Sequence, residues 1–143
     1  MIRKSPTESD VVTLLTLTSG ALATLLSESR SAHPDEACGL LLGADGHIER
    51  AVAAANVAPD PARHFEIDPA ALIAALRLER EGGAAVIGYW HSHPSGAPAP
   101  SATDQALASG DGRVWAIVAA SGIGWFRDAP GGFTALPTPR ISG

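Results

Sequence analysis

The order in which short apolar runs and amphipathic segments alternate constrains the fold of this chain more than any other feature. Apolar runs bounded by Gly, Pro or Asp predict strands, and segments with leucine and alanine at helical spacing predict helices. The predicted strands are residues 11–17, 36–43, 47–56, 64–67, 84–93, 113–119, 123–127 and 133–136. The predicted helices are residues 19–32, 69–81 and 101–109. Because helices and hairpins are mixed along the chain, the order predicts a mixed sheet with helices on its faces, in either an α/β or an α+β arrangement.

Local signals mark where several of these elements begin and end. Thr18 or Ser19 can cap the first helix, and His33-Pro34 ends it because a residue before proline disfavours helical geometry. Asp45-Gly46 predicts a hairpin turn. Asp68-Pro69 predicts a helix start, with aspartate as N-cap and proline at the first helical position. The side chains expected to face inward from the first two helices are Leu22, Leu25, Leu26, Ala71, Leu72, Ala75 and Leu76.

The composition is that of one folded domain. The chain has 143 residues, 45% of them hydrophobic and 17% charged, which excludes intrinsic disorder. We interpret residues 1–10 as a flexible N-terminal tail and residues 11–143 as a single domain. The net charge of −5 argues against a nucleic-acid-binding surface. A lone cysteine, Cys38, excludes an intrachain disulfide.

The N-terminal region resembles a signal peptide only superficially. Glu8 and Asp10 stand between the first basic residues and the uncharged run 11–27, and threonines and serines interrupt that run. No stretch reaches the roughly 20 apolar residues that a membrane-spanning helix needs. We therefore expect a cytoplasmic protein that has no membrane contact.

One segment of fourteen residues, from His91 to Asp104, carries the clearest chemical signal. His91 and His93 lie two apart at the end of a predicted strand, so both side chains can point toward one place. Pro94 ends the strand, and a loop rich in Pro, Gly and Ser returns the chain to a helix that starts at Ser101. Ser101 and Asp104 are three residues apart and therefore share a helix face.

This set of side chains suits a metal ion. Two neutral imidazoles and one carboxylate make a first shell for Zn²⁺, and three protein ligands leave a fourth position for water, as in catalytic sites. Taken separately, a His-x-His pair is usually found on surfaces, and Ser101 with Asp104 has the spacing of a capping box. Taken together, the histidine pair, the return loop and the Ser-x-x-Asp helix start predict a metal site.

Glu36 is the leading candidate for the general base that a hydrolase needs near its water. It stands at the start of an apolar strand, where it either lines a cleft or faces solvent. Cys38 shares the face of Glu36 on a regular strand, so it either approaches the metal or is a small buried hydrophobe. His64 and Phe65 either line a substrate groove or belong to an edge strand.

At this point the residues resemble the JAMM (MPN-plus, Mov34-type, JAB) zinc metallopeptidases. Their signature is an upstream Glu, then His-x-His-Pro, six residues, and Ser-x-x-Asp, and the segment 91–104 fits it without a gap. The resemblance implies that His91, His93 and Asp104 bind one Zn²⁺. It also implies that Glu36 is the general base and then the acid for the leaving amine, and that Ser101 donates a hydrogen bond to the oxyanion. The fold it implies is the deaminase-like α/β three-layer sandwich, a mixed β-sheet flanked by helices.

The same resemblance implies a substrate class. Family members cleave peptide or isopeptide bonds, often after the Gly-Gly tail of ubiquitin or a ubiquitin-like protein, and this chain looks like the small stand-alone prokaryotic type. The expected substrate is therefore a ubiquitin-like or sulfur-carrier protein. The chain lacks the long insertions with which eukaryotic members recognise polyubiquitin linkages, which argues against that specificity.

The sequence bears on three other functions. A RadC-like, DNA-associated protein has a similar His-x-His-Pro-Ser-Gly loop, but the acidic charge balance disfavours it. A nucleoside deaminase shares the fold but needs His-x-Glu and Pro-Cys-x-x-Cys, and the chain has one cysteine. A non-catalytic MPN scaffold stays possible at this point, and metal content distinguishes it from an enzyme.

Overall fold

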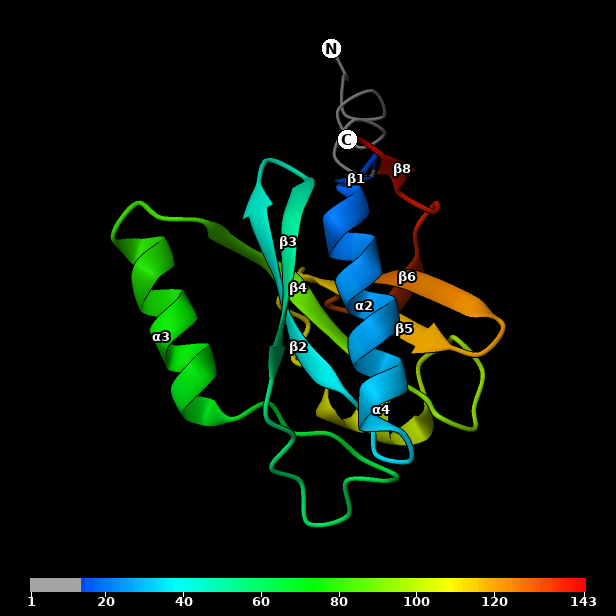
Figure 1. Cartoon of the computed structure of the whole chain (residues 1–143). Helices are drawn as coiled ribbons and strands as arrows, with labels where there is room; N and C mark the ends of the chain where they lie inside the picture. Colours follow the sequence, from blue (N-terminus) through cyan, green and yellow to red (C-terminus); the bar gives the residue numbers. More distant parts are fainter. Residues whose placement is uncertain (1–13) are drawn as a thin grey trace.

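The architecture is an eight-stranded mixed sheet with three helices, as the computed structural model of residues 14–143 shows (Figure 1). The strand order is β7-β6-β5-β4-β2-β3-β1-β8. The strands are β1 Thr16–Leu17, β2 Cys38–Ala44, β3 His47–Ala54, β4 Ala85–Ser92, β5 Val114–Ala119, β6 Gly122–Ala129, β7 Gly132–Ala135 and β8 Arg140–Ile141. The helices are α2 Ser19–Ala32, α3 Pro69–Arg80 and α4 Ala102–Leu107.

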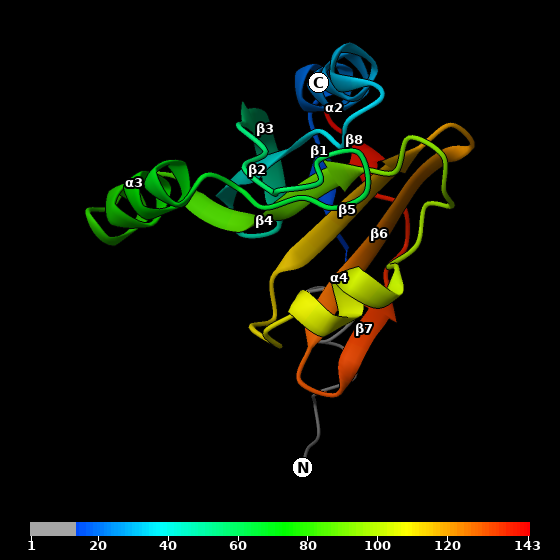
Figure 2. The same ribbon diagram turned by 90° about the horizontal axis from the view of Figure 1, so that it is seen from below.

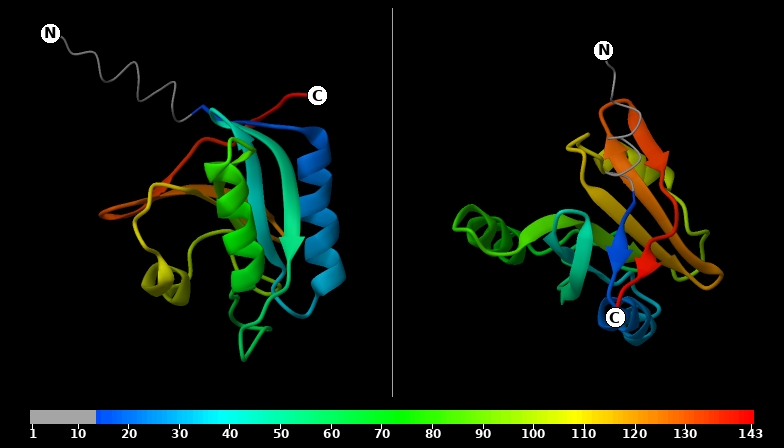
Figure 3. Two further views of the ribbon diagram at one scale, coloured as in Figure 1. Left: turned by 90° about the vertical axis from the view of Figure 1, so that its left-hand side faces the viewer. Right: turned by 90° about the horizontal axis from the view of Figure 1, so that it is seen from above.

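Both pairing directions occur in the sheet. Strand β4 lies at its centre, antiparallel to β2 and parallel to β5, and β5, β6 and β7 form an antiparallel meander. Helix α2 covers one face, while α3 and α4 lie on the other side (Figures 2 and 3). The predicted α/β sandwich with a mixed sheet between helices is therefore confirmed. In the part of the chain that is described, no helix combines the length and apolarity that crossing a membrane requires.

Helix α2 supplies one side of the core. The Thr18 hydroxyl accepts a hydrogen bond from the Ala21 N–H, as its predicted capping role requires, and Leu25 is fully buried against the sheet. The prediction for Leu26 was wrong, since this side chain is 36% exposed. It lies beside a hollow under the C-terminal half of α2 and not against the sheet. Helix α3 is more peripheral: none of its residues is fully buried, and Ile73 is exposed.

Close approach of three neighbouring strands fixes the orientation of Trp90 in the core. Its indole N–H crosses β2 and donates to the Val52 carbonyl oxygen at 3.1 Å. Gly39 of β2 lies beneath this bond, and a Cβ there would overlap the Val52 carbonyl and the indole nitrogen. A glycine is therefore required at this position by contact and not by backbone conformation.

The predicted boundaries hold for most elements. The hairpin at Asp45-Gly46 is confirmed, with φ of 50° and 77° at its two residues. Residues 64–67 do not form the predicted strand. Among them, only Ile67 takes part in β-pairing, through a single isolated bridge to Asn56. Strand β8 was not predicted, since it holds one apolar residue, Ile141, and is defined only by parallel pairing with β1.

Predictions for the N-terminus fall largely outside the described residues. The tail of residues 1–10 and the first part of the strand predicted at residues 11–17 lie there, and β1 accounts for the last two residues of that strand. The single domain over residues 11–143 and the cytoplasmic location stay predictions.

Candidate metal centre

The two histidines lie where the central strand ends. His91 is the last residue but one of β4, and His93 follows the strand directly. Their rings point the same way, as the spacing predicted, and the two Nε2 atoms are 3.0 Å apart. His91 is completely buried, and β2 and β5 hold its backbone from both sides. The sheet therefore fixes this pair firmly.

Asp104 reaches the same point from the first turn of α4. Its Oδ2 atom is 3.1 Å from the Nε2 atom of each histidine, and the residue is 3% exposed. The same carboxylate also accepts the Ser101 N–H at 2.9 Å, while the Ser101 hydroxyl accepts the Asp104 N–H at 3.0 Å. The capping box and the convergence on the histidines are therefore both present, because the Asp104 carboxylate accepts the Ser101 N–H and also lies against both imidazoles.

The chemistry of these three atoms fits a cation. The Nδ1 atom of His93 is 2.7 Å from the Ala97 carbonyl oxygen, so it carries a proton, and in the neutral ring Nε2 is then a lone pair. In that form Nε2 and the Asp104 carboxylate are both acceptors that a cation can satisfy, whereas without a cation the protonated ring donates a hydrogen bond to the carboxylate. Ligands of a tetrahedral Zn²⁺ lie about 3.3 Å from one another. The spacing of 3.0–3.1 Å among the three atoms is close to that value.

Glu36 stands next to this triangle, in the two-residue approach to β2. It is 6% exposed, and one of its carboxylate oxygens lies within 4.8 Å of one ring nitrogen of each histidine. Its backbone is fixed at both ends, since its N–H donates to the Pro61 carbonyl at 2.7 Å and its carbonyl accepts from the Asn56 side chain at 2.9 Å. Of the alternatives left open by the sequence, the cleft-lining position is the one observed.

Burial and charge set the pKa values in this cluster. Burial raises the pKa of Glu36 to about 7, with an opposing effect from His93 and a supporting one from the Asp104 charge. Burial also lowers the pKa of His91. Burial alone would raise the pKa of Asp104. Hydrogen bonds from both histidines outweigh this effect and hold the pKa well below its usual range. The cluster therefore contains one carboxylate that stays ionised and one that can exchange a proton near neutral pH.

Two residues that the sequence left open have defined places. The Cys38 thiol is 1% exposed and lies 3.7 Å from the Ala54 carbonyl oxygen, and burial raises its pKa to about 11. It is therefore a small buried side chain. Phe65 stacks on the ring of His91 with centroids 4.1 Å apart and an angle of 18° between the planes. No sequence pattern predicted that contact.

Ser101 is exposed at the start of α4. Because its oxygen accepts the Asp104 N–H, its own hydroxyl proton is directed elsewhere and is available to a bound molecule. The position is compatible with the predicted hydrogen bond to an oxyanion.

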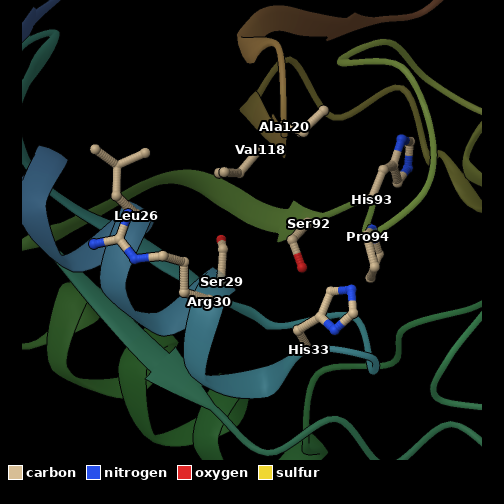
Figure 4. A pocket seen from close by; sticks show the side chains of 10 residues that line it. Leu26, Ser29, Arg30, His33, Ser92, His93, Pro94, Val118 and Ala120 are labelled. Atoms are coloured by element: carbon tan, nitrogen blue, oxygen red, sulfur yellow. The ribbon is translucent and has the colours of Figure 1, made fainter.

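A pocket of about 590 Å³ adjoins the cluster (Figure 4). Leu26 and Arg30 of α2, together with His33 directly after the helix, line one side, and the ends of β4 and β5 line the other. His93 belongs both to this lining and to the cluster of ligand atoms. Ser92 also lines the pocket, whereas Glu36, His91 and Asp104 do not, so the pocket lies under α2 and only His93 connects it with the candidate metal centre.

Comparison with known proteins gives concordant matches. A family model described as prokaryotic homologs of the JAB domain matches residues 18–130. The chain is 36% identical over 115 residues to desampylase from Haloferax volcanii, which covers 76% of this chain and 82% of that protein. It is 42% identical over 86 residues to a probable TtuB-protein conjugate cleaving protease from Thermus thermophilus, covering 56% of each.

Two further matches extend this result. A CysO-cysteine peptidase from Mycobacterium tuberculosis is 28% identical over 100 residues, with 68% of each chain covered. Among solved structures, protein DSY2949 from Desulfitobacterium hafniense has a TM-score of 0.75 and 30% identity, covering 90% of this chain and 96% of that one. The matched residues 18–130 include every residue of the candidate centre.

Proposed function

The chain belongs to the family of prokaryotic JAB-domain homologues, and from that premise we propose that it is a zinc metallopeptidase acting at the C-terminus of a ubiquitin-like or sulfur-carrier protein. The observation that carries the proposal is the convergence of His91, His93 and Asp104 on one point with Glu36 beside it. Three protein ligands and a neighbouring carboxylate are what a hydrolytic metal site needs.

His91, His93 and Asp104 would hold the ion. Zn²⁺ supplies Lewis acidity, which brings the pKa of a coordinated water to about 7 and polarises the scissile carbonyl. Zinc is favoured because two imidazoles and a carboxylate are among its usual ligands.

Glu36 acts as the proton carrier. Its carboxylate takes a proton from the attacking water and gives it to the nitrogen of the leaving amine, and burial, which raises the pKa of this carboxyl group, favours its role as proton acceptor. The Ser101 hydroxyl donates a hydrogen bond to the oxygen of the tetrahedral intermediate of the substrate, from a position that the capping box holds rigid.

The proposed substrate is a carrier protein joined through its C-terminal carboxyl group, with a Gly-Gly tail, to an amine. The names of the relatives support this class, since one is a probable TtuB-protein conjugate cleaving protease and another is a CysO-cysteine peptidase.

The experiment is incubation of the zinc-loaded protein with Gly-Gly-tailed carrier proteins that are extended at the C-terminus, followed by intact-mass analysis. We expect loss of the extension at the Gly-Gly carboxyl group, and no loss with the Glu36→Gln variant at equal zinc content. Bound zinc without cleavage of any carrier would refute the substrate class. Less than stoichiometric zinc after reconstitution would favour a scaffold.

A further inference from the structure

The two histidines of the candidate centre are oriented by different means. The ring of His93 is fixed by its hydrogen bond to the Ala97 carbonyl at 2.7 Å. His91 is completely buried, yet its Nδ1 atom has no hydrogen-bond partner among residues 14–143. Metal-binding histidines nearly always give the second ring N–H to a carboxylate, a carbonyl or water, which sets the ring orientation. Another contact must therefore orient His91.

Aromatic side chains provide that contact. Phe65 lies parallel to the His91 ring at 4.1 Å, and Trp115 meets the same ring nearly perpendicularly at 5.7 Å. The two aromatics also pack against each other, with centroids 5.9 Å apart. Rotation of the imidazole about its χ2 angle would drive its edge into the Phe65 ring, so the stack restricts the direction in which Nε2 points.

We propose that Phe65 is a positioning residue for the metal centre: its ring on His91 replaces the hydrogen bond that this ligand lacks. The inference rests on the proposed function, because it assumes that His91 binds a metal ion. It assigns a role to the segment 57–66, which carries Phe65 over the site although it forms no strand.

Asn56 holds that segment in place. Its side-chain N–H groups donate to the carbonyls of Glu36 and His64 at 2.9 and 3.0 Å, and its side-chain oxygen accepts the N–H groups of Ala58 and Glu66 at 3.0 and 3.1 Å. One side chain therefore ties the residues on both sides of Phe65 to the backbone of Glu36. The Asn56 amide thus links the backbone of Glu36, the proposed proton carrier, to the segment that places Phe65 against His91.

The test uses Co²⁺ as a spectroscopic replacement for the metal. Affinity is measured by competition with a chromophoric chelator, and ligand geometry is read from the visible d–d absorption. We expect Phe65→Leu, which keeps apolar bulk but removes the flat ring, to weaken Co²⁺ binding about 10–100-fold and to shift the spectrum. Phe65→Tyr, which keeps the ring, should stay within about threefold of the original chain.

Phe133→Leu is the matched control. Phe133 belongs to the same aromatic cluster and packs on Trp115 at 4.8 Å, whereas Phe65 packs on the ligand itself. The control should lower thermal stability and leave the Co²⁺ affinity and spectrum unchanged. Asn56→Ala should reproduce the spectral change of Phe65→Leu, because it releases the segment.

The outcomes separate this inference from the proposed function. Unchanged affinity and spectrum in Phe65→Leu would overturn the inference, and so would an equal loss of affinity in Phe133→Leu. Absence of Co²⁺ binding by the original chain would instead refute the metal site and with it the proposed function. Weakened Co²⁺ binding in Phe65→Leu together with normal binding in Phe65→Tyr would support the positioning role of Phe65.

Discussion

Glu36 should destabilise the metal-free protein at neutral and alkaline pH. Burial raises the pKa of its carboxyl group from 4.5 to about 7. Below pH 4.5 the group is protonated in both the folded and the unfolded chain, so its ionisation costs nothing. Between pH 4.5 and about 7 the folded chain binds more protons than the unfolded chain, and stability therefore falls as the pH rises.

The size of the effect follows from this difference in pKa. Each unit of pKa corresponds to about 1.4 kcal/mol, so the full cost above pH 7 is about 3 kcal/mol. Glutamine has nearly the shape of a protonated glutamate and carries no charge. We therefore expect Glu36→Gln to raise the free energy of unfolding by about 3 kcal/mol at pH 8 and to leave it nearly unchanged at pH 4.5.

The assay is urea denaturation of both proteins after removal of metal with a chelator, at several pH values from 4.5 to 8. Glu49→Gln is the matched control, since Glu49 is exposed on β3 and a surface substitution there should change the free energy of unfolding by less than about 0.5 kcal/mol. If the difference in free energy of unfolding between Glu36→Gln and the original chain does not increase with pH, this result refutes the argument. A difference of the opposite sign would also refute it, because it would mean that ionised Glu36 stabilises the metal-free fold.

Two further predictions concern the metal and the core. Asp104→Ala removes one of the three converging atoms and should reduce the zinc measured by elemental analysis well below one ion per chain, whereas unchanged zinc would show that the ligand set is wrong. Gly39→Ala places a methyl group against the Val52 carbonyl and the Trp90 indole, and should lower the free energy of unfolding in urea by about 1–3 kcal/mol; a change of less than 0.5 kcal/mol, roughly the size of a surface substitution, would contradict this account.

Local sequence signals predicted the parts of the site that depend on short spacing. His91 and His93 share a direction because strand geometry alternates, and Ser101 with Asp104 formed the capping box that their spacing indicates. The position of Phe65 could not be predicted in this way. It depends on hydrogen bonds between Asn56 and residues up to 20 positions away, and no periodic pattern encodes such bonds.

Pairing between the ends of the chain was also beyond the sequence. Strand β8 exists because Arg140 and Ile141 lie beside β1, more than 120 residues earlier. The exposure of Leu26 has a related cause. Helical spacing places it on the same side of α2 as Leu22, but only the tertiary structure shows that the sheet falls away beneath this end of the helix.

The residue between the two histidines explains why Glu36 lies beside the candidate metal ligands in this fold. Alternation along the strand turns Ser92 to the face opposite His91, and there its hydroxyl accepts the Ala37 N–H at 2.8 Å. The Ser92 N–H in turn donates to the Ala37 carbonyl at 3.0 Å, so the residue directly after Glu36 is bound at both backbone groups. One tripeptide therefore directs two imidazoles to one face of the sheet and fixes the backbone of the glutamate from the other. Because both functions depend on the same strand end, a shift of β4 by one residue would disrupt the metal site and the position of Glu36 together.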